Sequence, residues 1–232
     1  MALIEGVCLS KQYNTNGTAV QALRNADFRV EEGEFVAIMG PSGSGKSTLL
    51  AILGAMNPPT RGKLLVDGID VYDLSVEKRA DFRHEYLGFV FQQVQLIPYL
   101  SAVENVMLPL AITRRSHRDQ AEMAMSALER VGLADKARRL PNQLSGGEQG
   151  RVAIARAIVN NPPIILADEP TGSLDSGTGR EVMNLLRSLN EEGLTIVIVT
   201  HNPEYARYVG RVVQIRDGHV VADAQAAPFP TQ

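Results

Sequence analysis

The sequence predicts an α/β fold built on a mostly parallel sheet, and three observations support this. Short apolar runs, typical of strands that are buried on both faces, lie at 35–39, 164–167 and 194–199. Helical patterns alternate with these runs, at 47–56, 120–131, 150–160 and 179–191. The interval from about 94 to 160 contains helical signals and no convincing strand pattern. We therefore expect a helical subdomain inserted into an α/β core.

Two dipeptides indicate antiparallel pairing at the edges of this core. Asp67-Gly68 and Asp217-Gly218 follow the strand-like runs 63–66 and 212–215. Asp-Gly favours tight hairpin turns because both residues tolerate positive φ. Antiparallel strands are thus expected near the N-terminal and C-terminal sides of the chain.

Length and charge limit the classes of function. The 232 residues fit one domain, expected over 1–221, and small residues with two prolines predict a flexible tail over 222–232. Lys and Arg number 23 against 26 Asp and Glu, and this net charge of −3 disfavours nucleic acid as a partner. No apolar run approaches the ~20 residues that span a bilayer, and no secretory signal is apparent, so cytoplasmic residence is expected. A single cysteine, Cys8, excludes a disulfide within the chain and is expected to be buried.

A glycine-rich segment between the first strand and the first helix has the G-x-x-x-x-G-K-S pattern of phosphate-binding loops. Its glycines let backbone amides point at phosphate oxygens, and the helix N-terminus adds partial positive charge. Lys46 is expected to reach the β and γ phosphates, and Ser47 to offer its hydroxyl to Mg²⁺. The residues expected to bind nucleotide here are Gly40, Pro41, Ser42, Gly43, Ser44, Gly45, Lys46, Ser47 and Thr48.

Acidic and imidazole side chains follow two other predicted strands. Asp168 and Glu169 end the run that begins at 164, and His201 follows the run 194–199. The carboxyl edge of an open α/β sheet is where ligands bind. We expect Asp168 to hold Mg²⁺ through water, and Glu169 to polarise the water that attacks the γ phosphate.

A second glycine motif precedes the helix predicted at 150–160. It comprises Leu144, Ser145, Gly146, Gly147, Glu148 and Gln149. The S-x-x-E spacing is that of a capping box, so one interpretation is simply a helix start. The other is an anion site with no lysine of its own, which would complete the nucleotide pocket of another subunit.

Together these motifs resemble the ATP-binding cassette (ABC) family, from Tyr13 to about Val221. The resemblance implies a P-loop NTPase with a RecA-like α/β core, an antiparallel β subdomain and an inserted helical signature subdomain. It implies an ATP hydrolase with ATP and Mg²⁺ as cofactors, working as a head-to-tail homodimer. Lys46, Glu169 and His201 would be catalytic, His201 contacting the γ phosphate. It further implies that Tyr13 stacks on the adenine. Gln92 would contact Mg²⁺ together with Ser47 and Asp168. Ser173, Leu174 and Asp175 would form the D-loop, a segment that crosses the dimer interface.

Within the family the chain resembles the MacB, LolD and FtsE group, through Asp168-Glu169-Pro170-Thr171-Gly172 and the stretch 87–93. The MacB/LolD branch implies a subunit that drives an integral membrane permease from the cytoplasmic face of the inner membrane. Its work would be export or extraction of lipoproteins, peptides, drugs or haem. An FtsE-like partner in division or the cell wall is the alternative, and a soluble ABC ATPase is a third, disfavoured by the absence of a coiled-coil insertion.

Two further details bear on that partner. The stretch 96–110 is where the family docks a permease helix, although its apolar residues also fit plain subdomain core. Gly150 stands where many members of the family have glutamine, so any contact that this glutamine makes in them is in doubt here.

Overall fold

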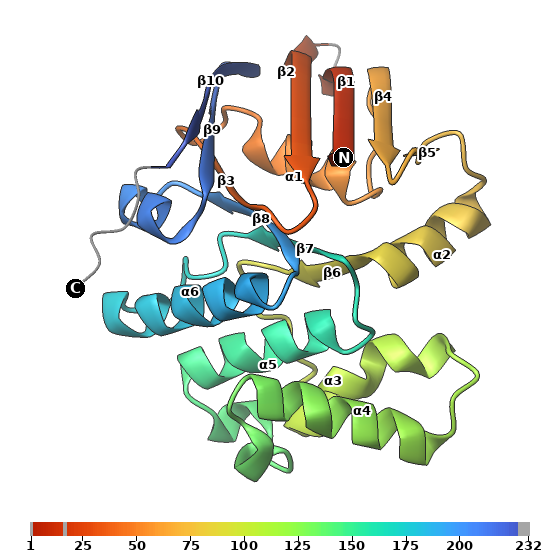
Figure 1. Cartoon of the computed structure of the whole chain (residues 1–232), viewed down its shortest axis with the longest axis vertical. Helices are drawn as coiled ribbons and strands as arrows, with labels where there is room; N and C mark the ends of the chain where they lie inside the picture. The colour runs from red at the N-terminus through yellow and green to blue at the C-terminus, as the bar shows by residue number, and fades with distance from the viewer. Residues whose placement is uncertain (1, 16–17, 227–232) are drawn as a thin grey trace.

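The computed structural model describes residues 2–15 and 18–226, which form a central sheet, a second sheet and a group of helices (Figure 1). The central sheet has the order β10-β9-β3-β8-β7-β6. Five of its strands are parallel, and β10 pairs with β9 in the antiparallel sense. Its strands are β3 (Phe35–Met39), β6 (Leu87–Val90), β7 (Ile164–Asp168), β8 (Thr195–Thr200), β9 (Arg211–Arg216) and β10 (His219–Gln225). The predicted parallel sheet is confirmed.

The second sheet is antiparallel and has the order β2-β1-β4-β5. Its strands are β1 (Ala2–Thr15), β2 (Thr18–Glu31), β4 (Arg61–Val66) and β5 (Ile69–Asp70). Asp67-Gly68 joins β4 to β5 and Asp217-Gly218 joins β9 to β10, with positive φ at all four residues. Both predicted hairpin turns are therefore confirmed.

Helices cover the central sheet and fill the chain between β6 and β7. The α-helices are α1 (Lys46–Leu53), α2 (Val76–Tyr86), α3 (Ala102–Met107), α4 (His117–Arg130), α5 (Gly146–Ile158) and α6 (Ser176–Glu191). Short 3-10 segments are η1 (Leu108–Ile112), η2 (Ala134–Lys136), η3 (Pro141–Gln143) and η4 (Pro203–Tyr208). Between β6 and β7 every described element is helical. Among the described residues, no helix is both long and apolar enough to cross a membrane.

The central strands separate two hydrophobic cores because alternate side chains point to opposite faces. In β3, Val36 and Ile38 join a core shared with α1 and the second sheet. Phe35, Ala37 and Met39 join the other core, which contains α3 to α6. The sheet thus places α1 on one face and α5 with α6 on the other (Figure 1).

Some elements were not predicted. The long β1–β2 hairpin lacks a regular alternation, because its register shifts between Gly6 and Leu9 and again further along. Helix α2 has a charged sequence with a single buried residue, Phe82, so its apolar periodicity is weak. Strand β6 has only four residues, one of them glycine.

Two expectations at the ends of the chain are wrong. Cys8 is exposed rather than buried, because it sits at the irregular part of β1 with φ of 50°, where the alternation of faces is broken. The segment expected to be a free tail is paired as far as Gln225 in β10, where Asp223 accepts two hydrogen bonds from the Arg211 guanidinium, at 2.6 and 2.7 Å. The last six residues of that predicted tail, 227–232, lie outside the described residues.

The contact between β6 and α5 leaves no space for a side chain at Gly88. A Cβ there would lie 2.2 Å from the carbonyl oxygen of Ala157 and 2.6 Å from Ile165 Cδ1. Gly88→Ala is therefore expected to lower the free energy of unfolding by roughly 1–3 kcal/mol, as overpacking does. The measurement is urea denaturation. Gly210→Ala is the matched control, since its Cβ would meet only the Phe35 oxygen at 3.7 Å; equal effects of the two variants would contradict the prediction.

Candidate functional site

Strand register brings three sequence motifs to one edge of the central sheet. Met39 is paired with Thr200, and Asp168 with Val199. Each of three residues therefore directly follows the last residue of a parallel strand: Gly40 follows β3, Glu169 follows β7 and His201 follows β8. The site is built at this carboxyl edge, as expected for an open α/β sheet.

The phosphate loop, residues 40–47, runs against the backbone of two other strands. A Cβ on Gly40 would lie 2.0 Å from the Ile215 oxygen of β9, and one on Gly45 would lie 2.3 Å from the Ala22 oxygen of β2. Gly45 also has φ of 107°, which L side chains rarely adopt. These two glycines are thus required by space and by backbone conformation.

The Asp217-Gly218 turn braces the phosphate loop from outside. The Gly218 amide donates to the Ser44 oxygen at 2.9 Å, and the Gly218 oxygen accepts from the Arg24 amide at 2.8 Å. The two hairpins at the ends of the chain therefore hold the loop. Sequence reasoning predicted the turn but not this contact, because the three segments are far apart in the chain.

Two polar groups of the loop fit an anionic ligand. Lys46 is almost fully buried, and its ammonium donates to the loop's own Gly40 and Pro41 oxygens at 2.9 and 2.8 Å. Ser44 Oγ is buried and has no hydrogen-bond partner among the described residues. A buried hydroxyl normally has a partner, so its position beside the N-terminus of α1 fits a phosphate oxygen bound there.

Ser47 and Asp168 offer oxygen atoms of the kind that Mg²⁺ binds. Ser47 Oγ lies 3.4 Å from Asp168 Oδ1. Burial raises the pKa of Asp168, and the neighbouring Glu169 carboxylate raises it further. A bound cation would have the opposite effect on this pKa.

Glu169 is held in an unusual conformation. Its φ is 46°, its amide donates to the Val199 oxygen at 2.9 Å, and its Oε1 lies 2.7 Å from His201 Nδ1. The Glu169 side chain is 14% exposed whereas that of His201 is 69% exposed. The backbone therefore fixes a covered carboxylate that can accept a proton, next to an imidazole open to solvent.

Among the described residues, no hydrogen bond joins Gln92 or Tyr13 to the polar groups of the site. Gln92 Nε2 lies 3.0 Å from the position of a Cβ on Gly172, in the segment that links Glu169 to the D-loop. Tyr13 is 37% exposed, and its hydroxyl accepts a hydrogen bond from Asn57 Nδ2 at 2.8 Å. The Lys11 ammonium lies over the Tyr13 ring, 5.3 Å from its centroid, so one face of the ring is already in contact with a cation.

The signature segment, residues 144–149, begins α5 with a capping box. The Ser145 hydroxyl accepts from the Glu148 amide, and the Glu148 carboxylate accepts from the Ser145 amide at 2.8 Å. Glu148 also forms an ion pair with Lys136 of η2, and the Gln149 side-chain amide donates to the Pro141 oxygen at 2.9 Å. The helix-start interpretation is thus correct for the isolated chain, and it leaves the anion-site interpretation open.

The D-loop, residues 173–175, lies beside the signature segment in the same chain. Leu174 Cδ2 is 3.4 Å from the Cβ position of Gly146. Asp175 caps α6, accepting from the Gly177 and Thr178 amides at 3.0 and 3.1 Å and from the Thr178 hydroxyl. These hydrogen bonds lower the pKa of Asp175.

Gly150 of α5 is not required by packing, because a Cβ there would meet its nearest neighbours only at 3.9 Å.

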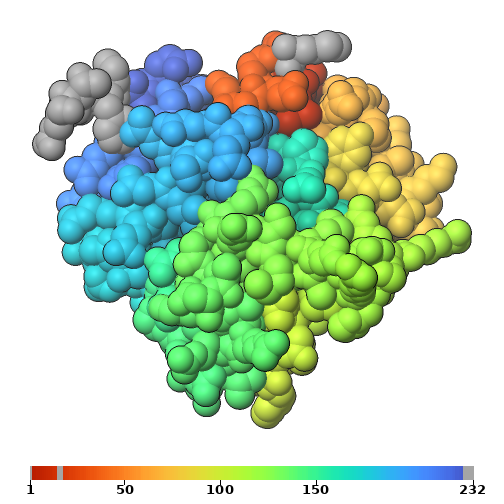
Figure 2. All heavy atoms as spheres, turned by 60° about the horizontal axis from the view of Figure 1, so that its bottom comes forward, coloured from red at the N-terminus to blue at the C-terminus, as the bar shows by residue number. Residues whose placement is uncertain are grey.

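The helices that begin at the phosphate loop and at the signature segment pack on opposite faces of the central sheet. Helix α1 packs against β1, β2, β7 and β8, whereas α5 packs against α3, α4, α6 and β6. The helical segment and α6 form adjoining parts of one outer face (Figure 2). The two segments are therefore anchored separately, and no hydrogen bond among the described residues joins the phosphate loop to the signature segment.

Comparison with known proteins identifies relatives of this chain. The family described as ABC transporter matches residues 23–172, which is more than half of the chain. The chain belongs to the ABC transporter family. Two relatives of the cassette, the uncharacterised ABC transporter ATP-binding proteins MJ1508 and MJ0796 of Methanocaldococcus jannaschii, are each 48% identical to it. The alignments cover 94% and 95% of this chain and 98% and 96% of the relatives.

A longer relative and solved structures refine the placement of the cassette. The macrolide export ATP-binding/permease protein MacB of Syntrophobacter fumaroxidans is 48% identical over 97% of this chain, which spans 32% of that protein. A dimeric structure of MJ0796 has a TM-score of 0.88 at 47% identity, and a dimeric post-hydrolysis state of MJ0796 bound to ADP and Pi has 0.87 at 45%. Each covers 97% of this chain and 100% of that one. The predicted family and fold class are confirmed, and the cassette is the ATP-hydrolysing subunit of an ABC transporter.

The close approach of α5 and α6 gives a prediction about the signature segment. A Cβ on Gly147 would lie 2.2 Å from Thr178 Cγ2. Gly147→Ala is expected to lower the free energy of unfolding by about 1–3 kcal/mol. Adding Thr178→Ser should restore part of that loss, because serine keeps the hydroxyl that donates to Asp175 and lacks the methyl. Urea denaturation of the two variants and of Thr178→Ser alone is the measurement; additive effects would contradict the proposed clash.

The pKa of Asp168 gives a second prediction, on the pH dependence of stability. The folded protein binds this proton more tightly than the unfolded chain, so the free energy of unfolding falls as the pH rises from the ordinary value of 3.8 through the raised pKa. Asp168→Asn removes that effect and is expected to raise the free energy of unfolding at pH 7, by less than about 1 kcal/mol because the group is half-exposed. The measurement is denaturation at a series of pH values, in which the difference in the free energy of unfolding between Asp168→Asn and the unmodified chain should shrink toward acidic pH. A gain that grows toward acidic pH would contradict the assignment.

Proposed function

We propose that this cassette powers a MacB/LolD-type complex that exports or extracts molecules from the inner membrane. It works as a homodimer docked peripherally on an integral membrane permease, at the cytoplasmic face. The single observation that carries the proposal is that the phosphate loop and the signature segment begin separate helices, on opposite faces of the sheet, and share no hydrogen bond among the described residues. The MacB relatives, which join such a cassette to a permease, support the membrane partner, and the cargo is proposed to be a lipoprotein, peptide, drug or haem.

In this proposal the phosphate loop binds the β and γ phosphates of ATP through its amides and Lys46. The ammonium exchanges the Gly40 and Pro41 oxygens for phosphate oxygens. Mg²⁺, held by Ser47, Asp168 and Gln92, supplies positive charge beside the phosphates. Tyr13 stacks on the adenine. The proposed nucleotide-binding set is the one expected from the sequence.

Hydrolysis depends on the covered Glu169 carboxylate. It orients a water toward the γ phosphate and accepts its proton, while His201 positions the carboxylate through the 2.7 Å contact and touches the γ phosphate. The left-handed backbone at Glu169 supports this role, because strain of that kind persists where a side chain must be aimed.

The signature segment of a second copy completes the site. Ser145 and the first amides of α5 face the phosphates bound to the other subunit, since Ser145 and Gly146 are exposed at a helix N-terminus. Ser173 and Leu174 of the D-loop meet the dimer interface, and the Asp175 carboxylate positions them by capping α6. We further propose one ATPase domain that extends through β10 to Gln225, beyond the expected boundary at 221, with residues of about 94–160 as the inserted helical subdomain.

Glu169→Gln is expected to bind MgATP, to form a stable dimer and to hydrolyse ATP roughly 10²–10⁴ times more slowly, because the amide cannot accept the proton. Dimer formation is measured by light scattering with and without MgATP, and turnover by phosphate release. Glu191→Gln, on the exposed face of α6, is the matched control. Undiminished hydrolysis by Glu169→Gln would overturn the role of Glu169, and a monomer in MgATP would overturn the dimer.

A further inference from the structure

The side chain of Asn57 lies at the centre of a small polar network beside Tyr13. Asn57 Nδ2 donates a hydrogen bond to the Tyr13 hydroxyl at 2.8 Å. The Lys11 ammonium donates to Asn57 Oδ1 and to the Pro58 oxygen, each at 2.6 Å. Asn57 and Lys11 are outside the phosphate loop, the signature segment and the D-loop, and sequence reasoning predicted no role for either.

The network fixes the direction in which the Asn57 amide points. An ammonium has three donors and no acceptor, so it is Oδ1 of Asn57 that faces Lys11. The amide nitrogen then faces the Tyr13 hydroxyl, which accepts its hydrogen bond. If the amide were reversed, its NH₂ group would oppose the ammonium. Lys11 therefore ensures that Asn57 presents a donor to Tyr13.

Lys11 also occupies one face of the Tyr13 ring. Its Nζ lies 5.3 Å from the ring centroid, which is within the range of a cation–π contact. The Tyr13 side chain is nevertheless partly exposed. A flat ligand that stacks on this ring is therefore expected to use the face opposite Lys11.

Asn57 is itself held to helix α1 by its backbone. Its amide donates to the Ala51 oxygen at 3.3 Å, and its oxygen accepts from the Tyr72 hydroxyl at 2.9 Å. The same hydroxyl donates to the Ile52 oxygen at 2.7 Å. Burial raises the pKa of Tyr72, so this hydroxyl keeps its proton. Because Ala51 and Ile52 belong to α1, these bonds join Asn57 to the end of that helix.

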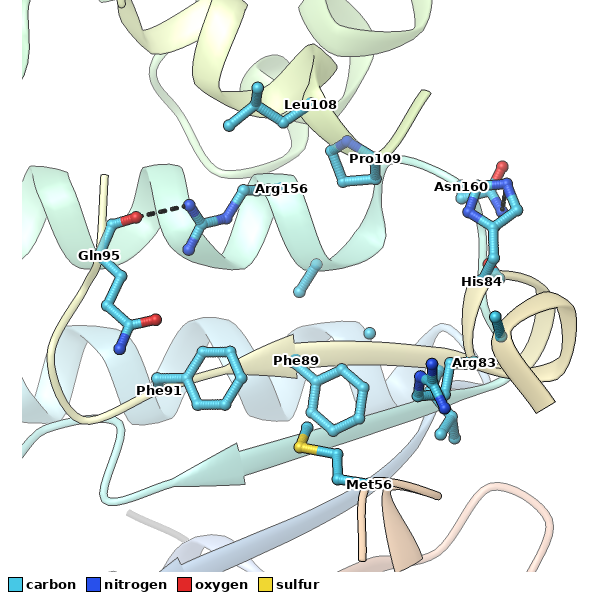
Figure 3. A pocket seen from close by; sticks show the side chains of 14 residues that line it. Met56, Arg83, His84, Phe89, Phe91, Gln95, Leu108, Pro109, Arg156 and Asn160 are labelled. Atoms are coloured by element: carbon cyan, nitrogen blue, oxygen red, sulfur yellow. Dashed lines mark hydrogen bonds between the residues drawn. The ribbon is translucent and has the colours of Figure 1, made fainter. Parts of the chain in front are cut away.

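The residues between α1 and Asn57 are closely packed. A Cβ on Gly54 would lie 2.8 Å from Phe89 Cε1, and the Arg83 guanidinium donates to the Ala55 oxygen at 3.1 Å. Figure 3 shows Met56, which precedes Asn57, near the Phe89 ring, and both residues line the same cavity. This segment is thus a rigid connection between α1 and Asn57.

Helix α1 consequently has fixed contacts at both ends. Its first residue, Lys46, belongs to the phosphate loop, and its last turn is tied to Asn57, which holds the Tyr13 side chain. Tyr13 itself comes from β1, a strand of the second sheet. The hydrogen bond between Asn57 and Tyr13 therefore sets the distance of the ring from the phosphate loop.

We infer that Asn57 is a positioning residue for the nucleotide base, which holds the Tyr13 ring at a fixed place relative to the phosphate loop. The inference rests on the proposed function for the stacking of adenine on Tyr13. A ring that is already held in place does not have to be ordered when the nucleotide arrives, and this saving increases the affinity.

The first experiment is a double-mutant cycle on the binding of MgADP, measured by calorimetry on the full chain. Tyr13→Phe keeps the ring and lacks the hydroxyl, whereas Asn57→Ala lacks the donor. Each is expected to weaken binding about three- to tenfold, the factor that corresponds to ordering one side chain. The double variant should be no weaker than either single one, because both changes remove the same hydrogen bond.

Other results of the cycle would overturn the inference. These are an unchanged affinity in both single variants, or losses that add in the double variant. Asn184→Ala, an asparagine exposed on α6, is the matched control and should bind MgADP like the unmodified chain.

A conservative variant separates positioning from a general effect on folding. Asn57→Asp keeps an acceptor for Lys11 and can accept the proton of the Tyr13 hydroxyl, so it should bind MgADP more tightly than Asn57→Ala. In ATP hydrolysis, Asn57→Ala should raise KM by a larger factor than it lowers kcat. Equal binding by the aspartate and alanine variants, or a loss confined to kcat, would contradict positioning by this hydrogen bond.

Tyr13→Ala distinguishes failure of the inference from failure of the proposed function. It removes the ring and should weaken MgADP binding more than Tyr13→Phe does. If Tyr13→Ala weakens binding while Asn57→Ala and Tyr13→Phe do not, the inference alone is overturned. If Tyr13→Ala leaves the affinity unchanged, the proposed stacking of adenine fails, and the inference fails with it.

Discussion

The register of the parallel strands is the constraint on which the rest of the structure depends. Met39 opposite Thr200 and Asp168 opposite Val199 bring the ends of three strands to one row. A shift of one residue in either pairing would move every side chain of that strand to the other face. The phosphate loop, the Glu169 carboxylate and the His201 imidazole would then no longer converge. The site thus relies on backbone pairing fixed by buried residues such as Ile38, which never approach a ligand.

The same sheet also keeps apart the two motifs that the proposed site needs. Because alternate side chains pack into two separate cores, α1 and α5 are anchored on opposite faces of the sheet. In the proposed homodimer, the signature segment of the second copy completes the site. ATP at the junction would stabilise the pair by mass action, and hydrolysis would remove that stabilisation.

Much of this could be predicted from the sequence, for physical reasons. The central strands are continuous apolar runs, and the Asp-Gly turns depend on two adjacent residues. The functional motifs are also local, since phosphate binding needs consecutive amides. Bracing of Ser44 by Gly218 could not be predicted, because it joins residues that only the tertiary fold brings together. Cys8 was wrongly expected to be buried, because a bulge in β1 breaks the alternation of faces from which burial is inferred. The capping of α6 by Asp175 was not predicted, because Asp175 was interpreted only as part of the D-loop.

The contact between Lys46 and its own loop affects how the site handles nucleotide. The ammonium already satisfies the Gly40 and Pro41 oxygens, so an arriving phosphate competes with an internal acceptor instead of meeting a free charge. Affinity is then the difference between two similar sets of hydrogen bonds, and the loop keeps its shape as one set replaces the other. With such a balance, phosphate can bind and leave while the positive charge of Lys46 always has an acceptor.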